Sequence, residues 1–160
     1  ERAAEQSGLE GMGTTLVAAA VRDGEATVVN VGDSRAYHVA EGAVDRITVD
    51  QSVVRNLIDE GVIDPEEADD HPQRHVLAQA LGTSETVDPD VYERSITGTL
   101  LLCSDGLTEE VPDPAIGSAV AGAPLDDAVD RLVDAANENG GSDNVSVVLC
   151  RDGARSGGEA

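Results

Sequence analysis

Runs of apolar residues divide the chain into two strand-rich parts separated by a more polar stretch. In the first part, short runs rich in Val, Thr and Ala favour β-strands. These strands are expected over 14–22, 26–31, 35–40 and 44–48. Asp23-Gly24 between the first two is a strong hairpin signal, and Glu41-Gly42 indicates a second turn. We therefore predict that the first part forms a meander of antiparallel strands.

Residues 50–90 have a different sequence pattern, in which polar residues surround short segments with helical spacing of apolar residues. Residues 52–60 place their apolar side chains at helical spacing. Asp64-Pro65 predicts a helix start, because Asp caps a helix well and Pro suits its first position. A further short helix is expected over 74–80. We interpret 50–90 as an insertion between the two strand-rich parts.

The remainder of the chain combines strands with helices. Strands are expected over 91–95, 99–103 and 145–150, and helices over 113–121 and 125–137. The segment 125–137 carries its apolar residues on one stripe, which is typical of a helix that packs against a core. The pattern predicts an α+β domain over 1–152, opening with the end of a helix at 1–7. The Gly-rich residues 153–160 are expected to be a disordered tail.

The length and composition of the chain indicate a single, acidic domain. The 160 residues suffice for a single domain and carry 32 acidic against ten basic side chains, all ten of them Arg, for a net charge of −22. Such a surface repels nucleic acid and anionic membranes, so neither is expected as a partner. Two explanations of the charge stay open. It attracts basic or metal-bearing partners, or it adapts the surface to a salt-rich, halophile-like cytoplasm, in which case low salt should loosen the fold.

Cysteine use and the ends of the chain bear on the cellular compartment. Cys103 and Cys150 both lie in apolar strand-like runs, which predicts reduced thiols in the core. Nothing resembles a signal peptide, and no apolar run approaches membrane-spanning length. We expect a cytoplasmic protein. The first residue is Glu1, which indicates processing or a longer polypeptide.

Three expected strand ends carry an aspartate in a turn. Asp33 and Asp105 follow buried runs, and Asp143 precedes one. A strand fixes the position of the backbone there, and the carboxylate supplies oxygen ligands for a hard cation. If the strands at 99–103 and 145–150 are neighbours, Asp105 and Asp143 meet and must share a cation or a proton. The sequence predicts an acidic metal site formed by these three residues.

Each aspartate also has a purely local explanation. Asp105 and Asp143 could each cap the helix or turn that follows it. Asp33 could form a turn with an ion pair to Arg35. From spacing alone, these alternatives stay open beside the metal site.

Other candidate motifs are weaker. His71 and His75 have the i, i+4 spacing of a zinc site on a helix, but Pro72 stands between them and no third soft ligand follows. His38 has no obvious partner in the sequence. Cys103 fails as a thiolate-phosphatase nucleophile, because Glu109 stands six residues later where an Arg would clamp phosphate. None of these residues is predicted to be catalytic.

Four blocks of residues, taken together and in order, resemble one known family. The blocks are Gly11-Met12-Gly13-Thr14-Thr15, Val31-Gly32-Asp33-Ser34-Arg35-Ala36-Tyr37, Leu101-Leu102-Cys103-Ser104-Asp105-Gly106-Leu107 and Ser142-Asp143-Asn144-Val145-Ser146-Val147-Val148. The chain is similar to the metal-dependent (type 2C) serine/threonine protein phosphatases in their compact prokaryotic form. The likeness runs from Gly11 to Leu149.

This resemblance implies both a fold and an activity. The fold would be a four-layer α-β-β-α sandwich of two antiparallel sheets. A dinuclear Mn²⁺ or Mg²⁺ centre would activate water to hydrolyse phosphoserine and phosphothreonine in proteins. Asp105 and Asp143 match the family's catalytic metal ligands, and Asp33 with Asp105 matches the position of a third ion. Residues 50–90 match the flap beside the cleft. The implied partners are phosphorylated proteins, such as an anti-sigma antagonist, and a serine/threonine kinase.

The chain also departs from the family pattern. The family's opening Arg/acidic block and its Asp-Gly-Met-Gly-Gly block have no counterpart here, so the chain resembles the carboxyl-terminal two-thirds of such a phosphatase. We expect exposed sheet edges, a gap in the core, weak metal binding and poor turnover. Two alternatives stay open: an inactive relative that binds a phosphoprotein or kinase partner, and an acidic cation-binding module without phosphate chemistry.

Overall fold

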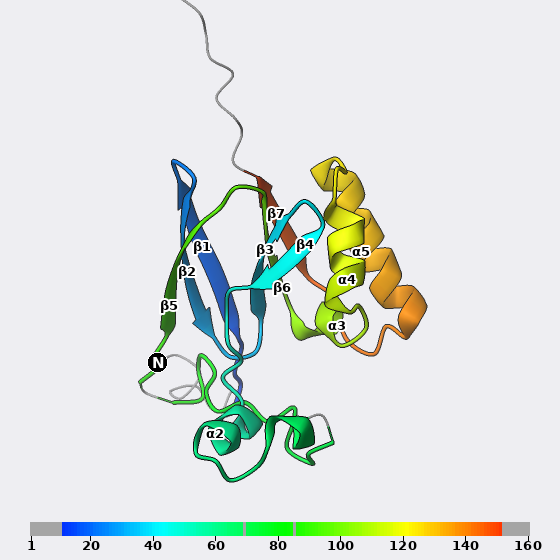
Figure 1. Ribbon diagram of the computed structural model, residues 1–160. Helices are drawn as coiled ribbons and strands as arrows, with labels where there is room; N and C mark the ends of the chain where they lie inside the picture. Colours follow the sequence, from blue (N-terminus) through cyan, green and yellow to red (C-terminus); the bar gives the residue numbers. More distant parts are fainter. Residues whose placement is uncertain (1–10, 69, 85, 152–160) are drawn as a thin grey trace, which may run out of the picture.

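Two antiparallel sheets pack face to face in the computed structural model, which describes residues 11–68, 70–84 and 86–151 (Figure 1). The first sheet has the strand order β1 (Leu16–Arg22), β2 (Glu25–Val31), β5 (Asp90–Ser95). The second has the order β4 (Ala43–Arg46), β3 (Arg35–Ala40), β6 (Thr99–Cys103), β7 (Val147–Arg151). The expected α+β fold with two packed antiparallel sheets is confirmed. The segments 1–7 and 153–160 lie outside the described residues.

The hairpin between β1 and β2 is confirmed, but the expected meander is wrong. Asp23 and Gly24 have φ angles of +52° and +80°, and Arg22 pairs with Glu25 across this two-residue loop. After β2 the chain crosses to the other sheet, where β3 pairs with β4 and β6. The crossing needs Gly32, whose φ is +98° and where a Cβ would lie 2.5 Å from Cγ2 of Thr15. Apolar spacing predicts strands, but it does not show which strands pair.

The central strand β6 is buried on both faces. Leu100 belongs to the cluster between the sheets, together with Val28 and Ala36. Leu101 points the other way, into a second cluster beneath the helices with Tyr37 and Leu132. A strand covered on both sides is expected to be apolar at successive positions, as this one is.

Three helices cover the outer face of the second sheet (Figure 1). They are α3 (Asp105–Thr108), α4 (Asp113–Val120) and α5 (Leu125–Asn139). The predicted amphipathic helix is confirmed in α5, because Ala128, Leu132 and Ala136 on one stripe are fully buried. Over the described residues, no helix lies on the outer face of the first sheet.

The two sheets have open edges at β1 and β7. Within the described chain, β1 pairs only with β2 and β7 only with β6. Val148 and Cys150 of β7 stand opposite Leu102 and Leu100, which places them on the face that looks toward the first sheet. The described part of the cluster between the sheets nevertheless includes no residue of β7, and Val148 is 59% exposed. Among the described residues, this side of β7 is therefore left largely uncovered.

The prediction of two core cysteines is right for Cys103 and wrong for Cys150. Cys103 is buried and Cys150 is exposed. Both lie in apolar strands, but only β6 is covered on both faces. Local apolarity therefore did not distinguish a central strand from an edge strand.

Thiol labelling should separate the two cysteines. We expect Ellman's reagent to modify Cys150 in the folded protein and Cys103 only after unfolding. Burial raises the pKa of the Cys103 thiol to about 12 and shields its sulfur, so almost no thiolate is available for reaction. The measurement is the number of thiols modified before and after adding denaturant. Rapid modification of both thiols in the folded state would contradict this burial.

The flap, residues 50–90, forms a separate lobe at one end of the sheets (Figure 1). It contains α2 (Val53–Asp59), which begins as predicted with Ser52 Oγ accepting a hydrogen bond of 3.1 Å from the Arg55 N–H, and a 3₁₀ turn η1 (Pro65–Glu67). The expected helix at 74–80 is absent, although these residues are described. Instead, Val76 O accepts from Val53 N and Ala78 N donates to Gln51 O, both at 2.8 Å. These bonds to the start of the flap take up backbone groups that a helix would need.

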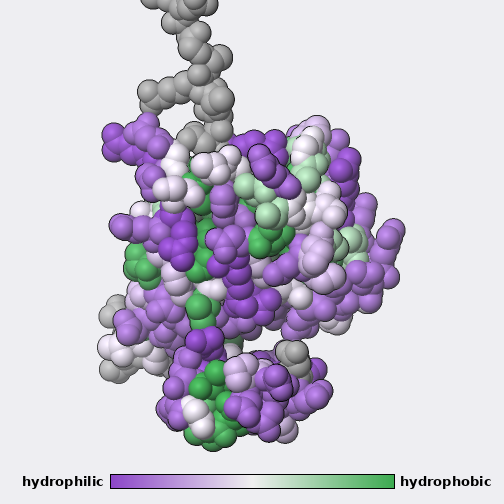
Figure 2. Space-filling view, in the orientation of Figure 1, coloured by the Kyte–Doolittle hydropathy of each residue, from purple (hydrophilic) through white to green (hydrophobic). Residues whose placement is uncertain are grey.

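The surface agrees with the acidic composition. Figure 2 shows a mostly hydrophilic face, with a hydrophobic patch on the lobe formed by the flap. Across the described ranges, no helix combines the length and the apolar character needed to cross a membrane.

Candidate functional site

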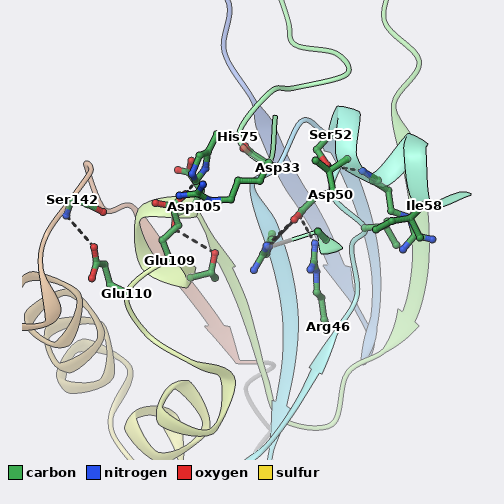
Figure 3. Close-up of a pocket in the computed structure, with 17 residues that line it drawn as sticks. Asp33, Arg46, Asp50, Ser52, Ile58, His75, Asp105, Glu109, Glu110 and Ser142 are labelled. Atoms are coloured by element: carbon green, nitrogen blue, oxygen red, sulfur yellow. Dashed lines mark hydrogen bonds and ion pairs between the residues drawn. The ribbon is translucent and has the colours of Figure 1, made fainter. Parts of the chain in front are cut away.

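A pocket of about 880 Å³ lies between the flap and the body of the molecule (Figure 3). The body contributes acidic side chains from the end of β2 and the start of α3. Basic side chains come both from the body, with Arg35 and Arg46, and from the flap, with Arg55 and Arg74. The lining includes Asp33, Asp105 and Glu110 from the body and Asp50, Arg55 and His75 from the flap. The pocket brings two of the three predicted aspartates together.

Asp33 lies in the short loop that carries the chain from one sheet to the other. Its carboxyl is half-buried, and burial together with the nearby charge of Asp105 raises its pKa above the ordinary value. The alternative of a local ion pair with Arg35 is not observed, because Arg35 pairs with Asp50, with Nη2 2.7 Å from Oδ2. Asp33 therefore faces another carboxylate in the pocket.

Asp105 is the first residue of α3, directly after the central strand. Its Oδ1 accepts a hydrogen bond of 2.9 Å from the Gly106 N–H. Beside it, the Ser104 N–H donates to Ser146 O at 3.1 Å, and the Ser146 N–H donates to Ser104 Oγ at 3.0 Å. These bonds extend the β6–β7 pairing beyond the strand ends. The condition that the sequence left open is met, because β6 and β7 are neighbouring strands.

The backbone at Asp143 packs close to the start of α3, which contains Asp105. The Asp143 side chain, however, lines a different pocket. A Cβ added to Gly106 would lie 2.5 Å from Asn144 O and 3.4 Å from the carbonyl carbon of Asp143. The Asp143 carboxylate is exposed, accepts a 2.6 Å bond from the Asn144 N–H, and lines an adjoining pocket of about 430 Å³. Ser142 lines both pockets. Asp33 and Asp105 thus line one pocket, and Asp143 lines the adjoining one.

No cluster of three metal-binding side chains is present within the part of the chain that the structure describes. The histidines do not change this result. His71 Nδ1 accepts a 3.1 Å bond from the Gln73 N–H, and His75 Nδ1 lies 3.0 Å from Glu109 Oε1. The two histidines therefore have separate partners, which lie close by in the sequence for His71 and at the end of α3 for His75.

Sequence reasoning missed the basic side of the pocket. Asp50 accepts hydrogen bonds from both Arg35 and Arg46, and all three line the pocket. Asp50 is only four residues from Arg46, but outside a helix this spacing has no regular meaning. The sequence suggests Arg35 only as a local partner for Asp33. The arginines are spread along the chain, so their order carries no signal for this cluster.

Removing the Asp33 carboxylate should stabilise the metal-free protein at neutral pH. Because the pKa of Asp33 is raised on folding, its contribution to stability is full below the unfolded-state pKa and is lost as pH rises through the folded-state pKa. Asn has no proton to lose, so Asp33→Asn should have the higher Tm only above that range. The measurement is Tm in chelator from about pH 3 to about pH 8. An equal or lower Tm for the variant at neutral pH would show that the ionised Asp33 carboxylate does not destabilise the folded protein.

Two curated relatives are similar to most of this chain. Serine/threonine protein phosphatase PstP of Mycobacterium tuberculosis is 42% identical over 143 residues, which cover 88% of this chain and 28% of PstP. Serine/threonine phosphatase stp of Listeria welshimeri is 40% identical over 144 residues, covering 88% of this chain and 57% of that protein. No family model matches the chain. The chain thus spans little more than half of stp and about a quarter of PstP.

Solved structures agree with the sequence relatives. The PPM Ser-Thr phosphatase MsPP from Mycobacterium smegmatis, in complex with cacodylate, has 41% identity and a TM-score of 0.76, covering 92% of this chain and 67% of that one. The catalytic domain of PstP in complex with two manganese ions has 37% identity and a TM-score of 0.78, covering 92% and 62%. The chain belongs to the metal-dependent (type 2C) serine/threonine protein phosphatase family.

Proposed function

We propose that the protein hydrolyses phosphoserine and phosphothreonine monoesters in proteins, using Mn²⁺ or Mg²⁺ held by Asp33, Asp105 and Asp143. The observation that carries the proposal is the Asp33–Asp105 pair in the large pocket. The family relationship supports it, as does the PstP structure that contains two manganese ions. The partners in this proposal are phosphorylated proteins, with a serine/threonine kinase among them.

The residues present fit a hard divalent cation. Carboxylate oxygens are the ligands such ions prefer, and the half-buried Asp33 lies close enough to Asp105 for the second charge to raise its pKa. A cation relieves this repulsion. Asp105 uses one oxygen on the Gly106 N–H and has no further described side-chain partner for the other. Asp143 is exposed in the adjoining pocket and is the third proposed ligand.

The side chains divide the chemical work between charge and positioning. When bound, the two metal ions lower the pKa of a coordinated water and neutralise phosphoryl oxygens. Asp33 and Asp105 supply the negative charge that holds cations at this wall of the pocket. Cys103 is no alternative nucleophile, because it is buried and its pKa is raised to about 12. The residues therefore favour direct attack by water over a covalent enzyme intermediate.

One observation favours a second candidate function. Since no three metal-binding side chains gather within the described ranges, the cleft could bind a phosphoprotein or kinase partner without hydrolysing it. This alternative requires saturable binding of the partner. It does not require Asp143.

Phosphate release from a phosphothreonine peptide in molar salt tests the two functions. We expect release that requires Mn²⁺ or Mg²⁺ and stops when a chelator is added. Isothermal titration of the protein with Mn²⁺ gives a second readout that does not depend on turnover. Saturable phosphopeptide binding without release, under either metal, would replace the catalytic function with the binding function.

A further inference from the structure

Arginines concentrate at the pocket of an otherwise strongly acidic chain. Four of the ten arginines, Arg35, Arg46, Arg55 and Arg74, line this pocket, although the net charge is −22. Figure 3 shows Arg46 and Asp50 on the side of the pocket opposite Glu109, Glu110 and Ser142. The pocket therefore has an acidic wall and a basic wall.

The basic wall is built around one carboxylate that two guanidinium groups share. Arg35 donates to Asp50 from Nε at 3.1 Å and from Nη2 at 2.7 Å, and Arg46 Nη2 donates to Asp50 Oδ1. The side chains of Arg35, Arg46 and Asp50 are 26%, 33% and 19% exposed. Two cations on one anion leave one positive charge that is only partly hydrated. Such a site favours a second anion.

The spare hydrogen-bond donors belong mainly to Arg46. Arg35 uses Nε and Nη2 on Asp50, and its Nη1 lies 3.4 Å from the hydroxyl of the buried Tyr37. Arg46 uses one N–H on Asp50, and its other donors have no partner among the described residues. Arg46 lines the pocket, so a bound anion could accept hydrogen bonds from it.

The cluster also lines the same pocket as the proposed metal ligands. Asp33 and Asp105 are among the residues that line this pocket together with Arg35, Arg46 and Asp50. A substrate with its phosphoryl group near Asp33 and Asp105 could therefore place a neighbouring group at Arg46.

We propose that the Arg35–Asp50–Arg46 cluster is a subsite for a second anionic group of the substrate protein, with Arg46 as the specificity-determining residue. The inference rests on the proposed function, because it places the hydrolysed phosphoryl group at the opposite wall. Asp50 is a positioning residue that orients both arginines. The anion is an acidic side chain or a second phosphoryl group close to the hydrolysed one, and the two share the ability to accept hydrogen bonds from a guanidinium.

The test compares phosphothreonine peptides that differ in one flanking group. Gln, Glu or phosphothreonine is placed in turn at each position around the hydrolysed phosphothreonine. Binding is read by stopped-flow fluorescence anisotropy in Mn²⁺ before hydrolysis proceeds, and phosphate release is followed in the same samples. The proteins are the full 160-residue chain, Arg46→Gln, and the control Arg55→Gln. Arg55 lines the same pocket but pairs with Asp59 on its own helix at 2.7 Å.

We expect an anionic flank at the favoured position to lower Kd about tenfold for the wild-type chain, as one charge-assisted contact allows. Arg46→Gln should abolish this difference, and Arg55→Gln should keep it. The direction of the change in Kd is informative. The overall negative charge of the chain opposes binding of a more acidic peptide, so tighter binding must come from a local contact. A gain with Glu, with phosphothreonine or with both supports the subsite and identifies the source of the anion.

Absence of any gain, or a gain that survives in Arg46→Gln, overturns the subsite. The phosphate-release readout separates this failure from that of the proposed function. Release without an anionic preference removes the subsite alone. An Arg46-dependent preference without release removes the catalytic function and leaves an anion-binding cleft.

Discussion

Replacing Asp105 with Asn is expected to lower metal-dependent phosphate release by at least about a hundredfold, in line with the loss of one key electrostatic group at an active site. The amide keeps an oxygen that can accept the Gly106 N–H bond, so the start of α3 should persist. The variant loses the negative charge that faces Asp33. The measurement is kcat/KM for a phosphothreonine peptide in molar salt with Mn²⁺, together with Tm as a check on folding.

The same variant has a readout that does not depend on activity. The charge of Asp105 is one cause of the raised pKa of Asp33, so Asp105→Asn should lower that pKa in the metal-free protein. An exposed aspartate on α5, in Asp130→Asn, is the matched control and should change neither property. Phosphate release that survives in Asp105→Asn would remove the role assigned to this residue.

Replacing Leu101 with Ala should cost about 3 kcal/mol of unfolding free energy, within the usual range for a large core residue. Leu101 is fully buried in the central strand and belongs to the cluster that the helices cover. Truncation leaves a cavity between β6 and the helices that pack against it. The measurement is urea unfolding in molar salt.

Leu16→Ala is the matched control, because Leu16 also lies in a strand but is 42% exposed. Its loss should be well below that of Leu101→Ala, about 1 kcal/mol or less. Equal losses would mean that the cluster beneath the helices does not carry the stability assigned to it. The pair therefore tests which part of the two-sheet sandwich carries its stability.

The anion subsite and the proposed metal site require different residues of the same pocket. The proposed metal site needs Asp33 and Asp105 in one pocket, and both residues line it. The subsite needs Arg46 to stay bound to Asp50 while keeping donors free, which the structure also provides. Variants of one wall should therefore leave the other intact, and the two proposals can fail separately.

The sequence by itself determined the elements with a strong local pattern. These elements are the strands, the Asp23-Gly24 hairpin and the apolar stripe of α5. Each depends on residues only a few positions apart, so it can be predicted without knowing the rest of the fold. The sequence also placed Asp105 after one apolar strand and Asp143 before another. These two strands, β6 and β7, are neighbours in the second sheet. The order of four motifs was enough to recognise the family.

Only the tertiary structure decided features that depend on which surfaces meet. The change of sheet at Gly32, the exposure of Cys150 and the absence of a helix at 74–80 each depend on partners far away in the sequence. The placement of Asp143 in a neighbouring pocket and the sharing of Asp50 by two arginines likewise have no local signal. The direction of these side chains and their ion pairs are determined by packing between segments that are distant in the sequence. Local sequence patterns do not indicate how such segments pack.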